Sequence, residues 1–214
     1  LWDHLIQDVD PDLPNYGDVS EHPELLDINL VEMINPNNGD WLHTNAIDYN
    51  ESLDQIVFSS RFLDEIFIID HSTTSEEASG SFGGISGKGG DFLYRWGNPK
   101  NYGRGTNDDK VLNDQHGVNW IKEGFPGEGN LIIFNNNPLD TTGQDHSIGN
   151  SSVIEIIPPL DSTFNYFIES GNSYGPEEPN WIYGGDSTFF SHFQSGSYRL
   201  KNGNTFITVS QEKY

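Results

Sequence analysis

The sequence predicts an all-β protein built from repeated sheets, and three observations carry this prediction. Short segments rich in Val, Ile, Phe and Tyr recur along the chain, and turns of Gly, Pro, Asn and Asp separate them. These segments return with a period, because the apolar runs that begin at Ile56, Leu131 and Thr205 lie 75 and then 74 residues apart. A histidine precedes each run, and helical periodicity is sparse.

The first repeat contains four expected strands. They are AIDY (46–49), QIVFSS (55–60), EIFIID (65–70) and DFLYRW (91–96). The composition of residues 71–90, which are rich in Gly and Ser, predicts a loop between the last two strands.

The second and third repeats follow the same pattern. The expected strands are GVNWI (117–121), NLIIFNN (130–136), SVIEII (152–157), then FNYFIE (164–169) or NWIYGG (180–185), and finally SYRL (197–200) and TFITVS (205–210). Residues 2–5 (WDHL) resemble the end of an earlier closing strand. One helix is expected over residues 20–27, with Ser20 as its N-cap and Pro23 in its first turn.

Two four-stranded antiparallel units and the start of a third favour a β-propeller. The expected divisions are the end of one blade and a connection at 1–38, a blade at 39–99, a blade at 100–186 and the start of another at 187–214. A period near 75 residues exceeds that of an ordinary blade, so long loops are expected on one face. The alternative is an all-β sandwich with coincidental spacing.

Three histidines occupy related positions in the repeats. His43 and His192 lie 13 residues before their apolar runs, and His116 lies 15 residues before its run. Repeats that stack around an axis place equivalent positions on one ring, so the three imidazoles are expected to form a site. Each histidine alone is more typical of a hydrogen-bonded turn residue.

The composition limits the classes of partner. The formal net charge is −23 with only 10 Lys and Arg residues, which argues against nucleic acid and anionic membrane surfaces as partners. The absence of cysteine excludes disulfides, thiolate zinc sites and cysteine nucleophiles. No segment approaches the roughly 18 apolar residues of a membrane span.

Several stretches resemble the arylsulfate sulfotransferase family. They include GDWLHTNAIDYNESLDQIVFSSR (39–61), GGDFLYRWGNP (89–99), DQHGVNWI (114–121), GNLIIFNNN (129–137) and SGSYRLKNGNTFI (195–207). The resemblance implies a six-bladed β-propeller, usually in an exported or periplasmic protein, of which this chain would hold about half. It also implies transfer of a sulfuryl group from an aryl sulfate to a phenol, without a nucleotide sulfate donor or another cofactor.

The resemblance assigns roles to the three histidines. The family's last histidine in chain order is the nucleophile of a ping-pong reaction through a sulfohistidine, which maps to His192. His43 and His116 would then bind the sulfonate and move protons. Catalysis of this kind depends on positioning and on positive or N–H groups around the sulfonate oxygens.

The chain departs from the family where an arginine is expected after the second histidine's strand. Residues 135–147 read NNNPLDTTGQDHS there, without arginine. His146 and Arg61 are candidate replacements, and Asn135 and Asn136 are candidate donors to the sulfonate. A non-catalytic propeller that has lost this arginine and binds a ligand or protein therefore stays open. A quinone-cofactor dehydrogenase also stays open, because such enzymes are propellers too.

Overall fold

The chain is all-β, as the sequence predicts. The computed structural model describes residues 2–30, 39–137, 150–185 and 189–210. These ranges contain twelve strands and five short 3₁₀ helices, of which the longest has four residues. Three of the sheets are antiparallel, and the fourth is a short parallel pair near the N-terminus.

The first large sheet contains the four strands expected in the first repeat. In sequence order they are β3 (Thr44–Asn50), β4 (Gln55–Ser60), β5 (Glu65–Asp70) and β6 (Tyr94–Trp96). Each pairs antiparallel with the next. The β5–β6 connection is the predicted loop, and it carries only the 3₁₀ helix η3 (Glu77–Ser79).

The second large sheet repeats this order. Its strands are β7 (His116–Trp120), β8 (Leu131–Asn135), β9 (Ser152–Ile156) and β10 (Trp181–Gly184). The fourth strand is therefore the NWIYGG segment, whereas Tyr166 of FNYFIE forms only an isolated bridge with Leu160. The 3₁₀ helices η4 (Pro99–Tyr102) and η5 (Asn107–Asp109) connect the two sheets.

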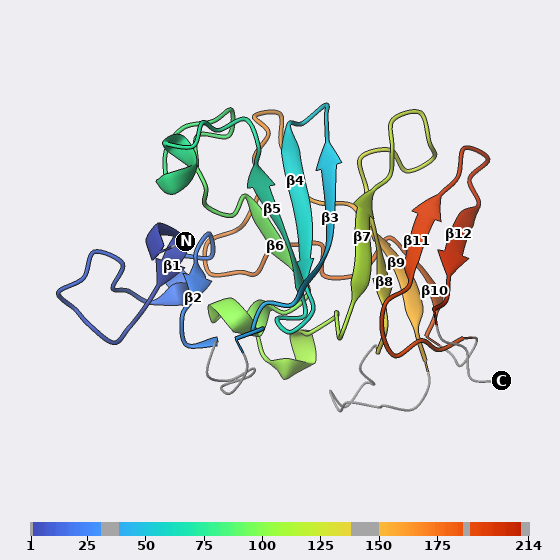
Figure 1. Ribbon diagram of the computed structural model, residues 1–214, viewed down its shortest axis with the longest axis horizontal. Coiled ribbons are helices and arrows are strands. Elements are labelled where there is room, and N and C mark those ends of the chain that lie inside the picture. The colour runs from blue at the N-terminus through green and yellow to red at the C-terminus, as the bar shows by residue number, and fades with distance from the viewer. Residues whose placement is uncertain (1, 31–38, 138–149, 186–188, 211–214) are drawn as a thin grey trace.

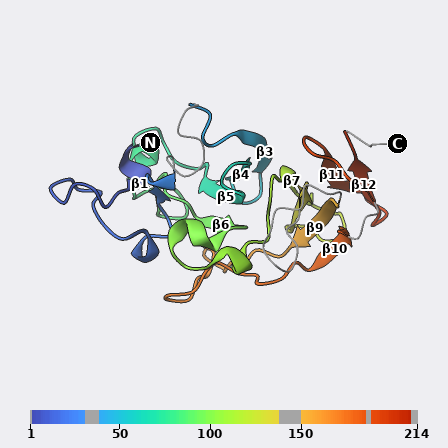
Figure 2. The same ribbon diagram turned by 90° about the horizontal axis from the view of Figure 1, so that it is seen from below.

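The third repeat begins with an antiparallel pair, as expected. Strand β11 (Gly196–Arg199) pairs with β12 (Thr205–Thr208). Figures 1 and 2 show this pair beyond the second sheet, on the side away from the first.

The N-terminal segment differs from the sequence-based expectations. Trp2–His4 form the 3₁₀ helix η1, and only β1 (Leu5–Ile6) is extended, pairing parallel with β2 (Leu26–Asp27). The helix expected over 20–27 is wrong. Only a short 3₁₀ helix, η2 (Val19–Glu21), forms there, and the side chain of Asp18 is its N-cap. The chain then becomes extended because the buried Leu26 of β2 pairs with Leu5. Tertiary pairing thus overrides local helix preference.

The large sheets stack face to face through apolar cores. In β8 the side chains of Leu131 and Ile133 enter the core shared with the first sheet. Those of Ile132 and Phe134 enter a second core, which includes Ile207 of β12. Successive residues of a strand point to opposite faces, so a strand buried on both faces reads as a continuous apolar run. This explains the sequence LIIF.

The first strands of the three antiparallel sheets are neighbours. Strand β7 packs against both β3 and β11. Figure 1 shows all three running in the same direction, with their first residues at the lower end. Within the described residues the sheets do not close into a ring, so the six-bladed propeller stays a prediction.

Candidate functional site

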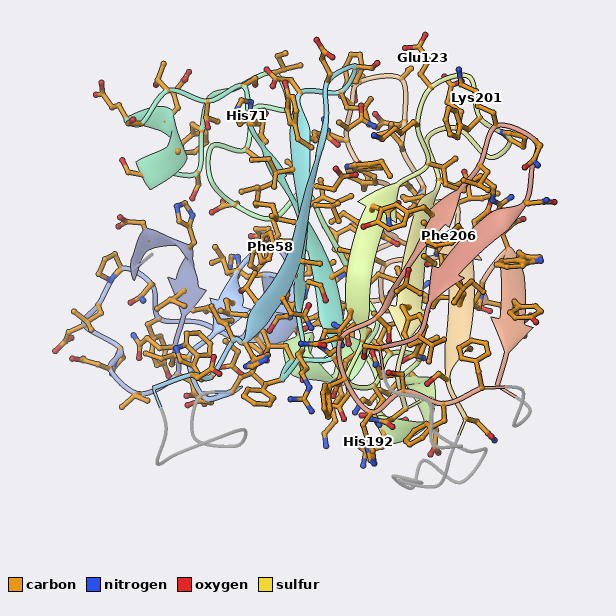
Figure 3. All side chains as sticks on the ribbon, turned by 45° about the vertical axis from the view of Figure 1, so that its right-hand side comes forward. Phe58, His71, Glu123, His192, Lys201 and Phe206 are labelled. Atoms are coloured by element: carbon orange, nitrogen blue, oxygen red, sulfur yellow. The ribbon has the colours of Figure 1, made fainter. Side chains whose placement is uncertain are left out.

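The three repeat-related histidines lie at one end of the sheets. His43 directly precedes β3, His116 is the first residue of β7, and His192 lies four residues before β11. Figure 3 shows His192 at the lower end of the molecule, whereas His71 lies at the opposite end. The repeat spacing therefore corresponds to a shared edge formed by the starts of three adjacent strands.

The backbone at this edge is unusual beside each histidine. His43 has a φ angle of 45°, Asp114 near His116 has 55°, and Gln194 near His192 has 58°. Residues with a side chain rarely adopt this left-handed region, and such positions are over-represented at functional sites and tight turns.

The imidazole of His43 is held on two sides. Its Nδ1 atom lies 2.5 Å from Oδ2 of Asp40, and its ring centroid lies 4.8 Å from that of Phe62. The His43 side chain is 37% exposed, so the ring is restrained but remains accessible from solvent.

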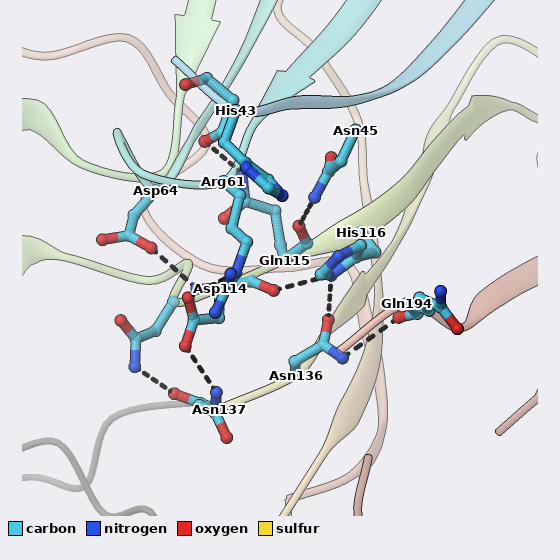
Figure 4. A network of polar contacts seen from close by, with 12 residues as sticks. His43, Asn45, Arg61, Asp64, Asp114, Gln115, His116, Asn136, Asn137 and Gln194 are labelled. Atoms are coloured by element: carbon cyan, nitrogen blue, oxygen red, sulfur yellow. Dashed lines mark hydrogen bonds and ion pairs between the residues drawn. The ribbon is translucent and has the colours of Figure 1, made fainter. Parts of the chain in front are cut away.

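Arg61 connects His43 to the second sheet. Its backbone N–H donates to the carbonyl oxygen of His43 at 3.2 Å, and its Nε lies 2.8 Å from Oδ1 of Asp114. The guanidinium carbon also lies 5.3 Å from the centroid of Phe62. Its two terminal nitrogens make no hydrogen bond or ion pair within the described residues, so the guanidinium is held in position and still has donors for a ligand (Figure 4).

Asp114 belongs to this candidate site, although the sequence did not single it out. Besides contacting Arg61, its carboxylate accepts from Nδ2 of Asn137 at 2.8 Å, and its backbone N–H donates to Oδ1 of Asp64 at 2.8 Å. The only sequence signal was its place two residues before His116, which is also typical of an ordinary turn.

Gln115 fixes the second sheet against the first. Its buried Nε2 lies within 3.0 Å of three acceptors, namely Ser59 Oγ and the carbonyl oxygens of Ser60 and Glu65. The backbone carbonyl oxygen of Gln115 accepts a hydrogen bond from Nδ2 of Asn45 on β3. These cross-sheet bonds set the distance between the starts of β3 and β7, and hence the placement of His43 relative to His116.

His116 is mostly buried, with 7% of its surface exposed. Its Nδ1 lies 2.9 Å from the carbonyl oxygen of Asp114 and 2.8 Å from Oδ1 of Asn136. Burial lowers the pKa of His116 below its ordinary value, although these two hydrogen bonds partly oppose the shift. The imidazole is therefore neutral near pH 7.

The two predicted asparagine ligands are already bonded within the protein. Asn135 accepts from the backbone N–H of Asn113 and donates to the carbonyl of Val111. Asn136 accepts from His116 and donates to the carbonyls of Ser191 and Gln194. Their predicted contact with a sulfonate stays untested, and these bonds favour a supporting role for both.

His192 lies on the segment that Asn136 holds. Its ring meets the edge of Phe190, with centroids 4.6 Å apart, and the residue is half-buried. The remaining predicted residue, His146, lies outside the described residues.

The contacts join into one network. It runs from His43 through Arg61, Asp114, His116 and Asn136 to the segment that carries His192 (Figure 4). A chain with a net charge of −23 repels anions, so an anionic ligand needs a local cation, and Arg61 supplies one here.

The described residues carry neither a metal-binding cluster nor a helix that could span a membrane. The described part of the chain holds no cluster of three or more His, Cys, Asp or Glu residues suited to a metal ion. In the same ranges none of the helices has the length and hydropathy needed to cross a membrane.

Comparison with known proteins agrees with the resemblance in the sequence. The sequence model of the family described as Arylsulfotransferase (ASST) matches residues 31–214. A search of curated proteins found no match. The matched region includes the strands of all three antiparallel sheets and every residue of the network described above. The chain belongs to the arylsulfotransferase (ASST) family.

Proposed function

We propose that this protein transfers a sulfuryl group from an aryl sulfate to a phenolic acceptor through a sulfohistidine on His192. The observation that carries the proposal is the network in which Arg61 and the neutral His116 lie between His43 and the segment of His192. It joins a candidate nucleophile, a cation for the sulfonate and a group that exchanges protons near pH 7.

In the first half-reaction a ring nitrogen of His192 attacks the sulfur of the donor. The new N–S bond forms as the S–O bond to the aryl group breaks, and the bonding electron pair leaves with the phenolate. The proton that the other ring nitrogen of His192 then loses passes through solvent to the phenolate. The terminal nitrogens of Arg61 bind the sulfonate oxygens, where negative charge is concentrated in the transition state. His43 lies beside Arg61 and contributes to sulfonate binding.

In the second half-reaction the hydroxyl oxygen of the acceptor attacks the same sulfur. The N–S bond breaks and the hydroxyl proton passes to a base, from which it returns through solvent to the ring of His192. Neutral His116 suits this role, because its Nδ1 is occupied by two acceptors and its Nε2 carries a lone pair.

The same proposal includes a propeller arrangement. Face-to-face packing of the large sheets, with β3, β7 and β11 as successive neighbours, supports sheets arranged as adjacent blades. Export, which the resemblance implies, stays a prediction.

One observation favours a second function. The arginine expected after the second histidine's strand is missing from residues 135–147, and a family member without it would bind an aryl sulfate or related anion without turnover. Arg61 decides between the two functions, because it is the described arginine that joins the histidine network.

The test is an assay of the full-length protein with 4-nitrophenyl sulfate as donor and a phenol as acceptor. We expect release of 4-nitrophenolate that depends on the acceptor, and loss of turnover in His192→Ala. The intermediate can be detected by mass spectrometry of the protein after incubation with donor and no acceptor. We expect a mass increase of one sulfuryl group that is lost on treatment with acid.

The matched control is His71→Ala. His71 is a histidine at the opposite end of the sheets, bonded to Asp54, and its loss should leave turnover unchanged. Turnover that survives His192→Ala would refute the nucleophile. Binding of 4-nitrophenyl sulfate without any turnover in the unaltered protein would favour the binding function.

A further inference from the structure

Nδ1 of His116 must carry a proton. Its two partners are the carbonyl oxygen of Asp114 and Oδ1 of Asn136, and both are acceptors. A neutral imidazole that donates from Nδ1 has its lone pair on Nε2. The surroundings therefore select one tautomer, and they leave Nε2 as the basic atom.

The orientation of the Asn136 amide is also determined by its surroundings. Its Nδ2 atom lies 2.8 Å from the carbonyl oxygen of Ser191 and 3.1 Å from that of Gln194. Only an N–H group can bond with both carbonyls, so Oδ1 must face His116. The side chain is fully buried, which makes any unpaired alternative costly.

Asn136 is thus shared between two parts of the proposed active site. One end of its amide bonds with His116 on the second sheet, and the other end bonds with the segment that carries His192 (Figure 4). Ser151 strengthens the second connection, because its hydroxyl donates to the carbonyl of Asn136 and accepts from the N–H of Ser191.

We propose that Asn136 is a positioning residue that holds His116 in the Nδ1–H tautomer and, with the same amide, holds the segment 191–194 in place. The state of His116 and the position of His192 are then set together. The inference rests on the proposed function for its catalytic meaning, but its structural content is independent of activity. It also replaces the role of Asn136 as a sulfonate ligand.

The test reads the tautomer directly by ¹⁵N NMR of the histidine side chains. The signal of His116 is assigned by its loss in His116→Gln. In the unaltered protein we expect a neutral ring protonated at Nδ1. In Asn136→Leu one of the two acceptors is removed, so the population protonated at Nε2 should rise about fivefold, the equivalent of one net hydrogen bond.

A second variant tests the position of residues 191–194 separately from the tautomer of His116. It also keeps the proposal testable if Asn136→Leu does not fold. Asn136→Asp keeps an acceptor toward His116 but has no N–H for the carbonyls of Ser191 and Gln194. We expect the Nδ1 proton to remain while hydrogen exchange at the Ser191 amide accelerates at least tenfold. The matched control is Asn135→Leu, which removes a neighbouring buried amide that does not contact His116 and should leave the tautomer unchanged.

An unchanged tautomer in Asn136→Leu would overturn the proposal, as would unchanged exchange at Ser191 in Asn136→Asp. An equal tautomer shift in Asn135→Leu would also overturn it, because the effect would then be general loosening. A protein that shows the tautomer shift but no sulfuryl transfer would refute the proposed function and leave the role of Asn136 standing.

Discussion

Two arginines of the first sheet have opposite environments. Arg95 on β6 has no exposed surface, and its Nε and one terminal nitrogen donate to the two carboxylate oxygens of Glu65 at 2.8 and 2.7 Å. Its other terminal nitrogen donates to the carbonyl of Leu25, and its guanidinium lies 4.4 Å above the ring of Tyr102. Every charged nitrogen of Arg95 has a partner.

Arg61 lies at the turn after β4 and is only partly paired. Its Nε contacts Asp114 without the alignment of a hydrogen bond, and its side chain is 25% exposed. A buried guanidinium with a partner at each of its three nitrogens supports the fold, whereas a partly exposed one held through Nε alone can bind an anion. The comparison therefore separates a structural arginine from a candidate binding arginine on the same sheet.

The largest effect is expected from breaking the buried pair. Glu65→Ala leaves the guanidinium of Arg95 buried without a counter-charge, so the free energy of unfolding should fall by about 3–5 kcal/mol. Urea denaturation measures this change. Because most domains are stable by only about 5–15 kcal/mol, much of the protein should unfold at a modest urea concentration.

The double variant Glu65→Leu with Arg95→Met sharpens this result. Removing both charges removes the unpaired group, so the double variant should be more stable than Glu65→Ala. If Glu65→Ala costs less than about 1 kcal/mol, Arg95 is not a structural arginine and the comparison fails.

The opposite pattern is expected at Arg61. Arg61→Ala removes a partly exposed ion pair, so stability should change by less than about 1 kcal/mol. It also removes the cation for the sulfonate, so kcat/KM for 4-nitrophenyl sulfate should fall by about 100-fold. Arg61→Lys keeps the charge but lacks the planar guanidinium, so its activity should lie between that of the unaltered protein and that of Arg61→Ala.

Arg104→Ala is the control for net charge. Arg104 donates to the carbonyls of Ser20 and Asn172, and neither of these residues belongs to the histidine network. Arg104→Ala removes one positive charge from the chain, as Arg61→Ala does. If both variants reduce activity to the same extent, the effect comes from the long-range field, and Arg61 has no local role.

The sequence predicted the strands well because their signals are local. Alternation and apolar runs identified all four strands of the first sheet, and the run NLIIFNN identified β8. The expectation failed where long-range contacts decide, as at residues 20–27. There Leu26 is buried in a two-residue strand that pairs with Leu5, a partner that no local pattern specifies.

The site divides in the same way. The repeat spacing alone predicted that the candidate residues His43, His116 and His192 lie at one edge of the sheets, because equivalent positions in stacked repeats are neighbours. Their catalytic role stays a prediction. The contacts of Arg61 with Asp114 and of Asn136 with Ser191 could not be predicted. They depend on left-handed turn residues and on the register between sheets, and a single sequence contains no pairwise signal for either.

The smallest expected effect is a pH dependence of stability that arises from His116, which lies near Arg61 in the network. Burial lowers the pKa of His116 in the folded protein, and the positive charge of Arg61 acts in the same direction, whereas Asp114 opposes it. The unfolded chain has an ordinary histidine pKa of about 6.5 and binds more protons below that value. The contribution of His116 to the free energy of unfolding should therefore be fully present above about pH 6.5. It should decrease as the pH falls from there toward the pKa of the folded protein.

Urea denaturation at several values between about pH 5 and 8 measures this dependence. His116→Gln cannot titrate, so it should lose less stability than the unaltered protein as the pH is lowered through this window. Equal losses in both proteins would mean that folding does not hold His116 neutral. That result would remove the base from the proposed second half-reaction, while the contrast between Arg61 and Arg95 would remain.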